Sequence, residues 1–73
     1  MHALILNLIP TTGSLVRIIG TAERRGWEPV AMAMTSRGSE VELRLQVRGT
    51  QPVDRLVRQL TRLLDVASVR VEP

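Results

Sequence analysis

The sequence contains no cysteine, lysine, tyrosine or phenylalanine, and only one tryptophan and one histidine. Without cysteine the chain can form no disulfide and no zinc–thiolate cluster, and it offers no thiol nucleophile. The single histidine, His2, lies beside the N-terminus, where a Ser/His/Asp set is not expected. The carboxylates are typical of helix caps and surface charges. We therefore expect no catalytic residue and no metal ligand in this chain.

Long apolar runs are also missing. The longest fall far short of the roughly 18 residues that a membrane-spanning helix needs, and no signal peptide is evident. We expect a cytoplasmic protein without a membrane partner. A chain of 73 residues has room for one domain, residues 1–73. Domains this small bury only about 60% of their unfolded surface, so a second copy or a partner is expected to add stability.

All ten basic residues are arginine, and the formal net charge is +3. Codon usage in a GC-rich genome is a sufficient explanation for the absence of lysine. The arginines are spread along the chain, whereas a phosphate-binding surface needs charge concentrated on one face. Arg55, Arg58 and Arg62 are predicted to form the solvated face of a helix. We therefore predict no nucleic-acid partner.

Hydrophobic periodicity predicts four strands and two helices in the order βαββαβ, which is the ferredoxin-like α+β plait. Its four-stranded antiparallel sheet carries both helices on one face. The predicted strands are residues 3–9, 29–35, 40–48 and 66–72, and the predicted helices are residues 14–25 and 52–64. The apolar stripe expected on the second helix is Val53, Leu56, Val57, Leu60, Leu63 and Leu64.

The helix ends and glycines support local predictions. A hydroxyl of Thr11 or Thr12 is expected to cap the first helix, and Thr50 is expected to cap the second. Gly20 lies inside the first helix, where close backbone packing would explain its cost of about 1 kcal/mol relative to alanine. Gly26 is placed to end that helix in a left-handed conformation.

The second strand is uncharged and is expected at an edge of the sheet, where an exposed strand invites pairing. We predict that two copies pair there to form one eight-stranded sheet; the alternative is a monomer whose loops cover the edge. The predicted interface is Val30, Ala31, Met32, Ala33 and Met34.

The open face of the sheet combines small and charged side chains, so it either docks a partner or is solvated. Its members are Ala3, Ala31, Ala33, Glu40, Glu42, Arg44, Arg48 and Arg70. Trp27 is expected to pack at the start of the second strand, in the core or an interface.

Three segments carry a resemblance to a known family. They are residues 13–20 (Gly-Ser-Leu-Val-Arg-Ile-Ile-Gly), 25–27 (Arg-Gly-Trp) and 59–66 (Gln-Leu-Thr-Arg-Leu-Leu-Asp-Val). They resemble motifs of the ACT domains in the small regulatory subunit of acetolactate synthase (acetohydroxyacid synthase), with Arg62 in place of the usual lysine. The chain ends where such a domain ends, so it is most similar to the short single-domain subunits of the valine-insensitive isozyme.

The resemblance implies a non-catalytic regulatory subunit of branched-chain amino-acid biosynthesis, which leads to isoleucine, valine and leucine. It would dock on the large catalytic subunit and activate it. The cofactors implied on that partner are thiamine diphosphate, FAD and Mg²⁺, and none of them is expected on this chain.

In this family an effector amino acid sits between two chains, against the loop after the first strand, the following helix N-terminus and the neighbour's second strand. Free amide groups and the helix dipole favour a carboxylate there. By resemblance the candidate residues are Thr11, Thr12, Gly13, Ser14 and Glu28. A plain helix cap and turn is the alternative interpretation of this loop.

Pro10 and Glu28 stand where valine-responsive subunits carry asparagine. Proline offers neither a side-chain amide nor an N–H. The Glu28 carboxylate could hold the ammonium group of an effector, but it would also repel the effector's carboxylate. Inhibition by valine is therefore not expected.

Two other functions stay open. A stand-alone ACT sensor would bind an amino acid and act on a different enzyme or regulator. An RNA-binding plait shares this fold but needs aromatic side chains on its central strands to stack bases, and the strands expected at residues 3–9 and 40–48 contain none.

Overall fold

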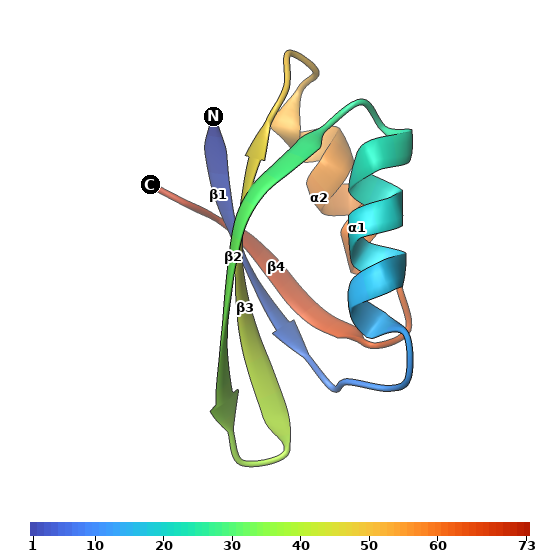
Figure 1. The fold of residues 1–73 in the computed structure, drawn as a ribbon, viewed down its shortest axis with the longest axis vertical. Helices are drawn as coiled ribbons and strands as arrows, with labels where there is room; N and C mark the ends of the chain where they lie inside the picture. The colour runs from blue at the N-terminus through green and yellow to red at the C-terminus, as the bar shows by residue number, and fades with distance from the viewer.

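The computed structural model describes residues 1–73 and confirms the predicted order of elements (Figure 1). They are β1 (His2–Leu8), α1 (Ser14–Arg24), β2 (Glu28–Arg37), β3 (Glu40–Arg48), α2 (Val53–Thr61) and β4 (Val66–Glu72). The strands form one antiparallel sheet in the order β2-β3-β1-β4. Both helices lie on the same side of this sheet (Figure 1). The ferredoxin-like prediction is therefore confirmed.

The core lies between the helices and the two central strands. Leu4, Leu6 and Leu8 of β1 are fully buried, because alternate side chains of a strand point to the same face. Opposite them on β3 stand Leu45, Leu43 and Val41. The helices contribute Ile18 and Ala22 from α1 and Leu56 and Leu60 from α2.

Neither helix is capped by a threonine hydroxyl, which corrects the prediction for Thr11, Thr12 and Thr50. The residue before α1 is Gly13, in the left-handed region with a φ of 82°. The residue before α2 is Pro52, and neither position makes a side-chain capping hydrogen bond. At the other end of α1, Gly26 has a φ of 83°, as predicted.

Helix α2 ends three residues earlier than predicted, at Thr61. The chain then turns into β4 through short-range backbone bonds from Leu63 N–H to the Leu60 carbonyl and from Val66 N–H to the Leu63 carbonyl. Such tight bonds are typical of helix ends. Leu64 falls in this turn and is fully exposed, so the prediction that it belongs to the buried stripe is wrong.

The close backbone packing predicted for Gly20 occurs at Gly49 instead. A β-carbon added at Gly20 would meet only the guanidinium of Arg24, at 3.1 Å. One added at Gly49 would lie 2.7 Å from the ring of Trp27. Trp27 is 2% exposed and belongs to the core, and His2 packs edge-on against it with ring centroids 5.7 Å apart.

Strand β2 forms one edge of the sheet, as predicted, and its register with β3 shifts between Pro29 and Ala31. The residues of β2 after Pro29 are all exposed. Helices α1 and α2 have eleven and nine residues, and neither is long and apolar enough to cross a membrane.

Candidate functional site

Ser14, the first residue of α1, fixes the loop after β1 (residues 9–13) through its side-chain hydroxyl. The Ser14 hydroxyl accepts a hydrogen bond from the backbone N–H of Thr11 at 2.9 Å. The same hydroxyl donates to the carboxylate of Asp65, in the turn before β4. Ser14 is 5% exposed, so its side chain is committed to these internal contacts.

Arg17, one turn further along α1, also fixes this loop through its side chain. Its guanidinium donates to the carbonyl of Thr12 at 3.0 Å and to the hydroxyl of Thr11 at 2.8 Å. It also donates to Asp65 at 2.7 Å, so Asp65 ties Ser14 and Arg17 to the turn before β4. The shape of the loop is therefore set before any ligand arrives.

Asp65 is the buried charge of this region, at 6% exposure. The hydrogen bond from Ser14 and then the one from Arg17 lower the pKa of its carboxyl group, against the opposing effect of desolvation. A carboxylate beside the first turn of a helix is also favoured by the helix dipole. This helix N-terminus consequently already has an internal anion on one side.

A shallow cavity of about 320 Å³ lies between the loop and β2. It brings together Thr11, Gly13 and Ser14 with Met34 of β2. Thr12 does not line the cavity, and its carbonyl accepts the hydrogen bond from Arg17. Three of the five predicted effector residues thus share one hollow.

Glu28 lies elsewhere in the chain. It follows the C-terminal end of α1, and this helix of eleven residues separates it from the loop by about 16 Å. Its carboxylate accepts two hydrogen bonds from Arg48 on β3. A site that uses both the loop and Glu28 therefore requires a second chain.

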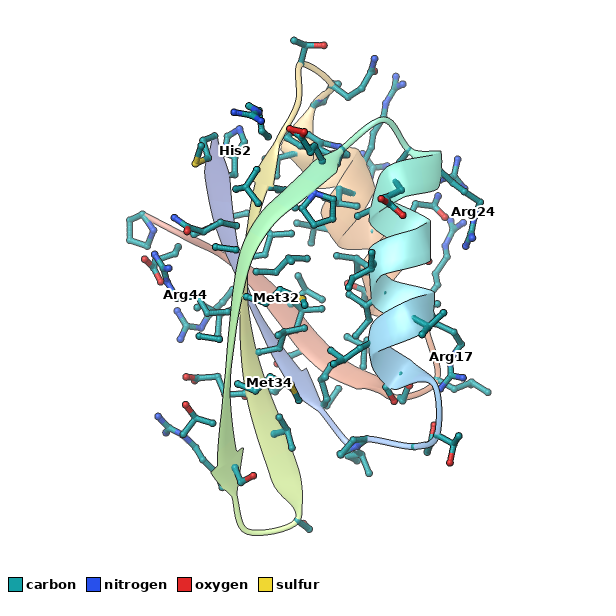
Figure 2. The ribbon with its side chains drawn as sticks, in the orientation of Figure 1. His2, Arg17, Arg24, Met32, Met34 and Arg44 are labelled. Atoms are coloured by element: carbon teal, nitrogen blue, oxygen red, sulfur yellow. The ribbon has the colours of Figure 1, made fainter.

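The β2 residues on the helix side of the sheet form an exposed apolar band, which we call the β2 band: Val30, Met32 and Met34. Their exposed fractions are 39%, 45% and 49%. Figure 2 shows Met32 and Met34 on this strand. Val16 of α1, at 76% exposure, lines the hollow next to Met34.

The sequence interpretation missed the pair formed by Arg17 and Asp65, although both residues lie in the segments quoted for the family resemblance. Helical periodicity alone places Arg17 on the outer face of its helix, because periodicity describes one element at a time. Their contact spans 48 positions along the chain. No group of three or more His, Cys, Asp or Glu side chains is placed to hold a metal ion.

The sequence pattern of the ACT domain matches residues 10–69, which include the loop, both helices and β2 to β3. The chain belongs to the ACT domain family. ACT domains are regulatory rather than catalytic modules. No curated protein matches the sequence.

Solved structures with the same fold come from several kinds of protein. The small subunit of acetolactate synthase from Thermotoga maritima has a TM-score of 0.83 at 17% identity, over 99% of this chain and 47% of that one. The ACT domain of GTP pyrophosphokinase from Chlorobium tepidum has a TM-score of 0.76 at 12% identity, over 97% of this chain and 95% of that one. A homoserine dehydrogenase from Thiobacillus denitrificans has a TM-score of 0.77 at 20% identity, over 96% of this chain and 16% of that one.

Proposed function

We propose that this ACT domain is the non-catalytic regulatory subunit of an acetolactate synthase, and that it works as a side-by-side dimer. The observation that carries the proposal is the exposed β2 band at an unpaired strand edge. An unpaired edge strand of ten residues, apolar from Pro29 to Met34, is a template for pairing, and pairing with a second copy would satisfy its free backbone groups.

The register of the sheet explains how such a dimer would complete the effector site. Leu8, the last residue before the loop, aligns with Val41, and Val41 aligns with Ser36. If two β2 strands pair antiparallel around Met32, Glu28 of one copy lies opposite Ser36 of the other. Glu28 of one copy then lies at the same end of the joint sheet as the neighbour's loop, three strand spacings of about 4.8 Å from Leu8.

The effector amino acid would lie between the loop of one copy and β2 of the other. Thr11, Thr12 and Gly13 are exposed there, whereas Ser14 would act through the loop conformation, since it is buried against Asp65. Pro10 still removes one amide, and Glu28 still adds a negative charge. We therefore propose a dimer that does not respond to valine.

Docking on the large catalytic subunit is supported by the motif resemblance and by the likeness to the Thermotoga maritima small subunit. Thiamine diphosphate, FAD and Mg²⁺ would be held by that partner. The regulatory dimer would contribute no reacting group, and would favour the active conformation of the catalytic subunit.

The test is co-expression with the acetolactate synthase large subunit of the same organism, followed by an assay of acetolactate formation with and without this chain, each with and without valine. We expect activation that valine leaves unchanged. Activation that valine reverses would contradict the argument from Pro10 and Glu28. The absence of both activation and co-purification would contradict the proposed partner.

The second candidate is a stand-alone amino-acid sensor of another enzyme. It is favoured by the likeness to ACT domains that belong to a GTP pyrophosphokinase and a homoserine dehydrogenase. The two candidates share the loop site and the dimer, and they differ in the partner. Calorimetry with the proteinogenic amino acids, in the absence of any catalytic subunit, would identify an effector. Binding of an amino acid together with no activation of acetolactate synthase in the assay above would favour the sensor.

A further inference from the structure

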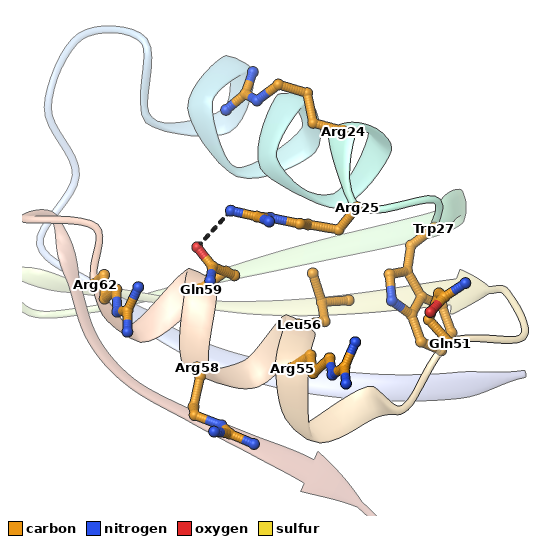
Figure 3. A pocket seen from close by; sticks show the side chains of 9 residues that line it. All are labelled: Arg24, Arg25, Trp27, Gln51, Arg55, Leu56, Arg58, Gln59 and Arg62. Atoms are coloured by element: carbon orange, nitrogen blue, oxygen red, sulfur yellow. Dashed lines mark hydrogen bonds between the residues drawn. The ribbon is translucent and has the colours of Figure 1, made fainter.

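A groove between the C-terminal end of α1 and the exposed side of α2 gathers half of the arginines in the protein (Figure 3). Its floor includes Trp27 and Leu56, both buried. The residues that line it are Arg24, Arg25, Trp27, Gln51, Arg55, Leu56, Arg58, Gln59 and Arg62. We call this groove, with its five arginines, the arginine groove.

The fold creates this cluster from residues that are far apart in the sequence. Arg25 reaches from the end of α1 to α2, where it donates to the side-chain oxygen of Gln59 at 3.0 Å (Figure 3). On α2, Arg55 and Arg62 lie one turn before and one turn after Gln59, so they stand on the same side of the helix. The arginines are spread along the chain, as the sequence shows, but the fold brings five of them to one groove.

None of these five arginines has an ion-pair partner. The four ion pairs of the protein use Arg17, Arg37, Arg44 and Arg48, which lie at the loop or on the sheet. No carboxylate lines the groove. Asp54 lies one turn before Arg58 in α2, and yet no ion pair joins them.

Such charge segregation is unfavourable in the free protein. Arg55, Arg58 and Arg62 are spaced three and four residues apart, and like charges at these spacings destabilise a helix. A purely solvated surface is expected to mix charges of both signs. An anion in the groove would remove this repulsion. Each guanidinium can present two parallel N–H donors to the oxygens of such an anion.

We propose that the arginine groove binds a small ligand that carries several phosphates in a chain, either a nucleoside polyphosphate or an inorganic polyphosphate. The cavity measures about 350 Å³, which lies in the range of small-molecule sites. The side-chain amides of Gln51 and Gln59 add neutral hydrogen-bonding groups at its edge. A phosphate chain concentrates three or four negative charges within this volume.

Two larger kinds of partner fit the groove less well. Carboxylates one helical turn apart on an acidic peptide carry one charge each, so few of them would enter a cavity of this size. Single-stranded nucleic acid needs exposed aromatic faces for stacking, and Trp27, the only aromatic side chain of the groove, is 2% exposed.

The probe is sodium tripolyphosphate, titrated into the protein while the fluorescence of Trp27 is recorded. We expect saturable binding that is at least tenfold tighter than that of orthophosphate at the same ionic strength, and that weakens as salt is added. Calorimetry with a nucleoside triphosphate then distinguishes the sources. If the nucleoside triphosphate binds more tightly than tripolyphosphate, the site is assigned to nucleotides. If the two ligands bind equally, the site recognises the phosphate chain alone.

The test variant is R55Q/R62Q, and the matched control is R37Q/R70Q, which removes the same charge from residues outside the groove. We expect the test variant to bind tripolyphosphate at least tenfold more weakly and the control to bind almost as the parent does. Equal weakening in both variants would overturn the proposal, because it would show non-specific attraction. Tighter binding of a glutamate-rich peptide or of an RNA oligonucleotide would also overturn it.

Discussion

The guanidinium of Arg17 lies 2.7 Å from the carboxylate of Asp65, and this contact joins the first helix to the turn before the last strand. Arg17 also holds the loop after β1 through Thr11 and Thr12. The side chain of Asp65 is 4% exposed, whereas that of Arg17 is 45% exposed. The buried carboxylate is therefore the centre of the network, and the arginine closes it from the solvent side.

Replacing Asp65 by asparagine should destabilise the protein by about 1–3 kcal/mol, because the hydrogen bonds from Ser14 and Arg17 lose their charged acceptor. The measurement is urea unfolding at pH 7, followed by circular dichroism. The control is E42Q, which removes a surface ion pair with Arg37 at 3.7 Å and should change stability by less than about 1 kcal/mol. Equal effects of the two variants would show that the Asp65 network adds nothing beyond a surface contact.

Acid should weaken the fold through the same carboxylate. Hydrogen bonds, first from Ser14 and then from Arg17, lower the pKa of Asp65, and the paired hydrogen bonds from Arg44 lower the pKa of Glu72. A carboxyl group with a lowered folded pKa stabilises the protein above its unfolded pKa of about 4, and this contribution is lost as the pH falls through the folded value. Unfolding free energies should therefore be level from pH 7 to 5 and fall below about pH 4.

The D65N variant provides the check on that assignment. Its stability should fall less steeply between pH 5 and the acid limit than that of the parent, since one of the two responsible groups no longer titrates. Parallel curves for the parent and D65N would mean that acid acts through other carboxylates.

Gly49→Ala should destabilise the protein by about 1–3 kcal/mol, as overpacking of a core does. The added methyl would lie 2.7 Å from the ring of Trp27, which is buried and has no room to withdraw. Urea unfolding gives the free energy, and a shift in the Trp27 emission shows whether the ring has moved. An unchanged stability with an unchanged emission would contradict the close approach.

The elements of the fold were predictable because each depends on a local pattern. The alternation of β3 and the spacing of Leu56 and Leu60 on α2 fix which side chains face the core. The helix ends were harder to predict. Hydroxyl capping is a local rule, but the start of α1 is set by the φ of Gly13 and by contacts with Asp65, which is distant in sequence.

The site was predictable only in part, for a related reason. The family motifs located the loop, but a linear reading cannot show that Ser14 is buried by Asp65. The arginine groove was missed because its members come from two helices that meet only in the fold. Periodicity correctly placed Arg55 and Arg62 on an exposed helix face, and it contains no information about Arg25 on the neighbouring helix.

Gly20→Ala should stabilise the protein by about 1 kcal/mol, because alanine has the higher helix propensity and restricts the unfolded chain. The only atoms near the new methyl belong to the guanidinium of Arg24, whose flexible end can move away. Thermal and urea unfolding should both show the gain. A loss of stability would mean that the hydrogen bond from Arg24 to Thr21, at 3.3 Å, matters more than helix propensity.

Met32→Glu should convert the proposed dimer to a monomer, because it places a negative charge at the centre of the β2 band, opposite its own copy. Met32 is 45% exposed in the single chain, so the substitution is compatible with the fold of the monomer. Sedimentation equilibrium measures the change. Val71→Glu is the matched control: Val71 is 41% exposed and lies on β4, the opposite edge of the sheet, so this variant should remain dimeric. A dimeric M32E protein would place the contact between copies on another surface, and with it the shared effector site.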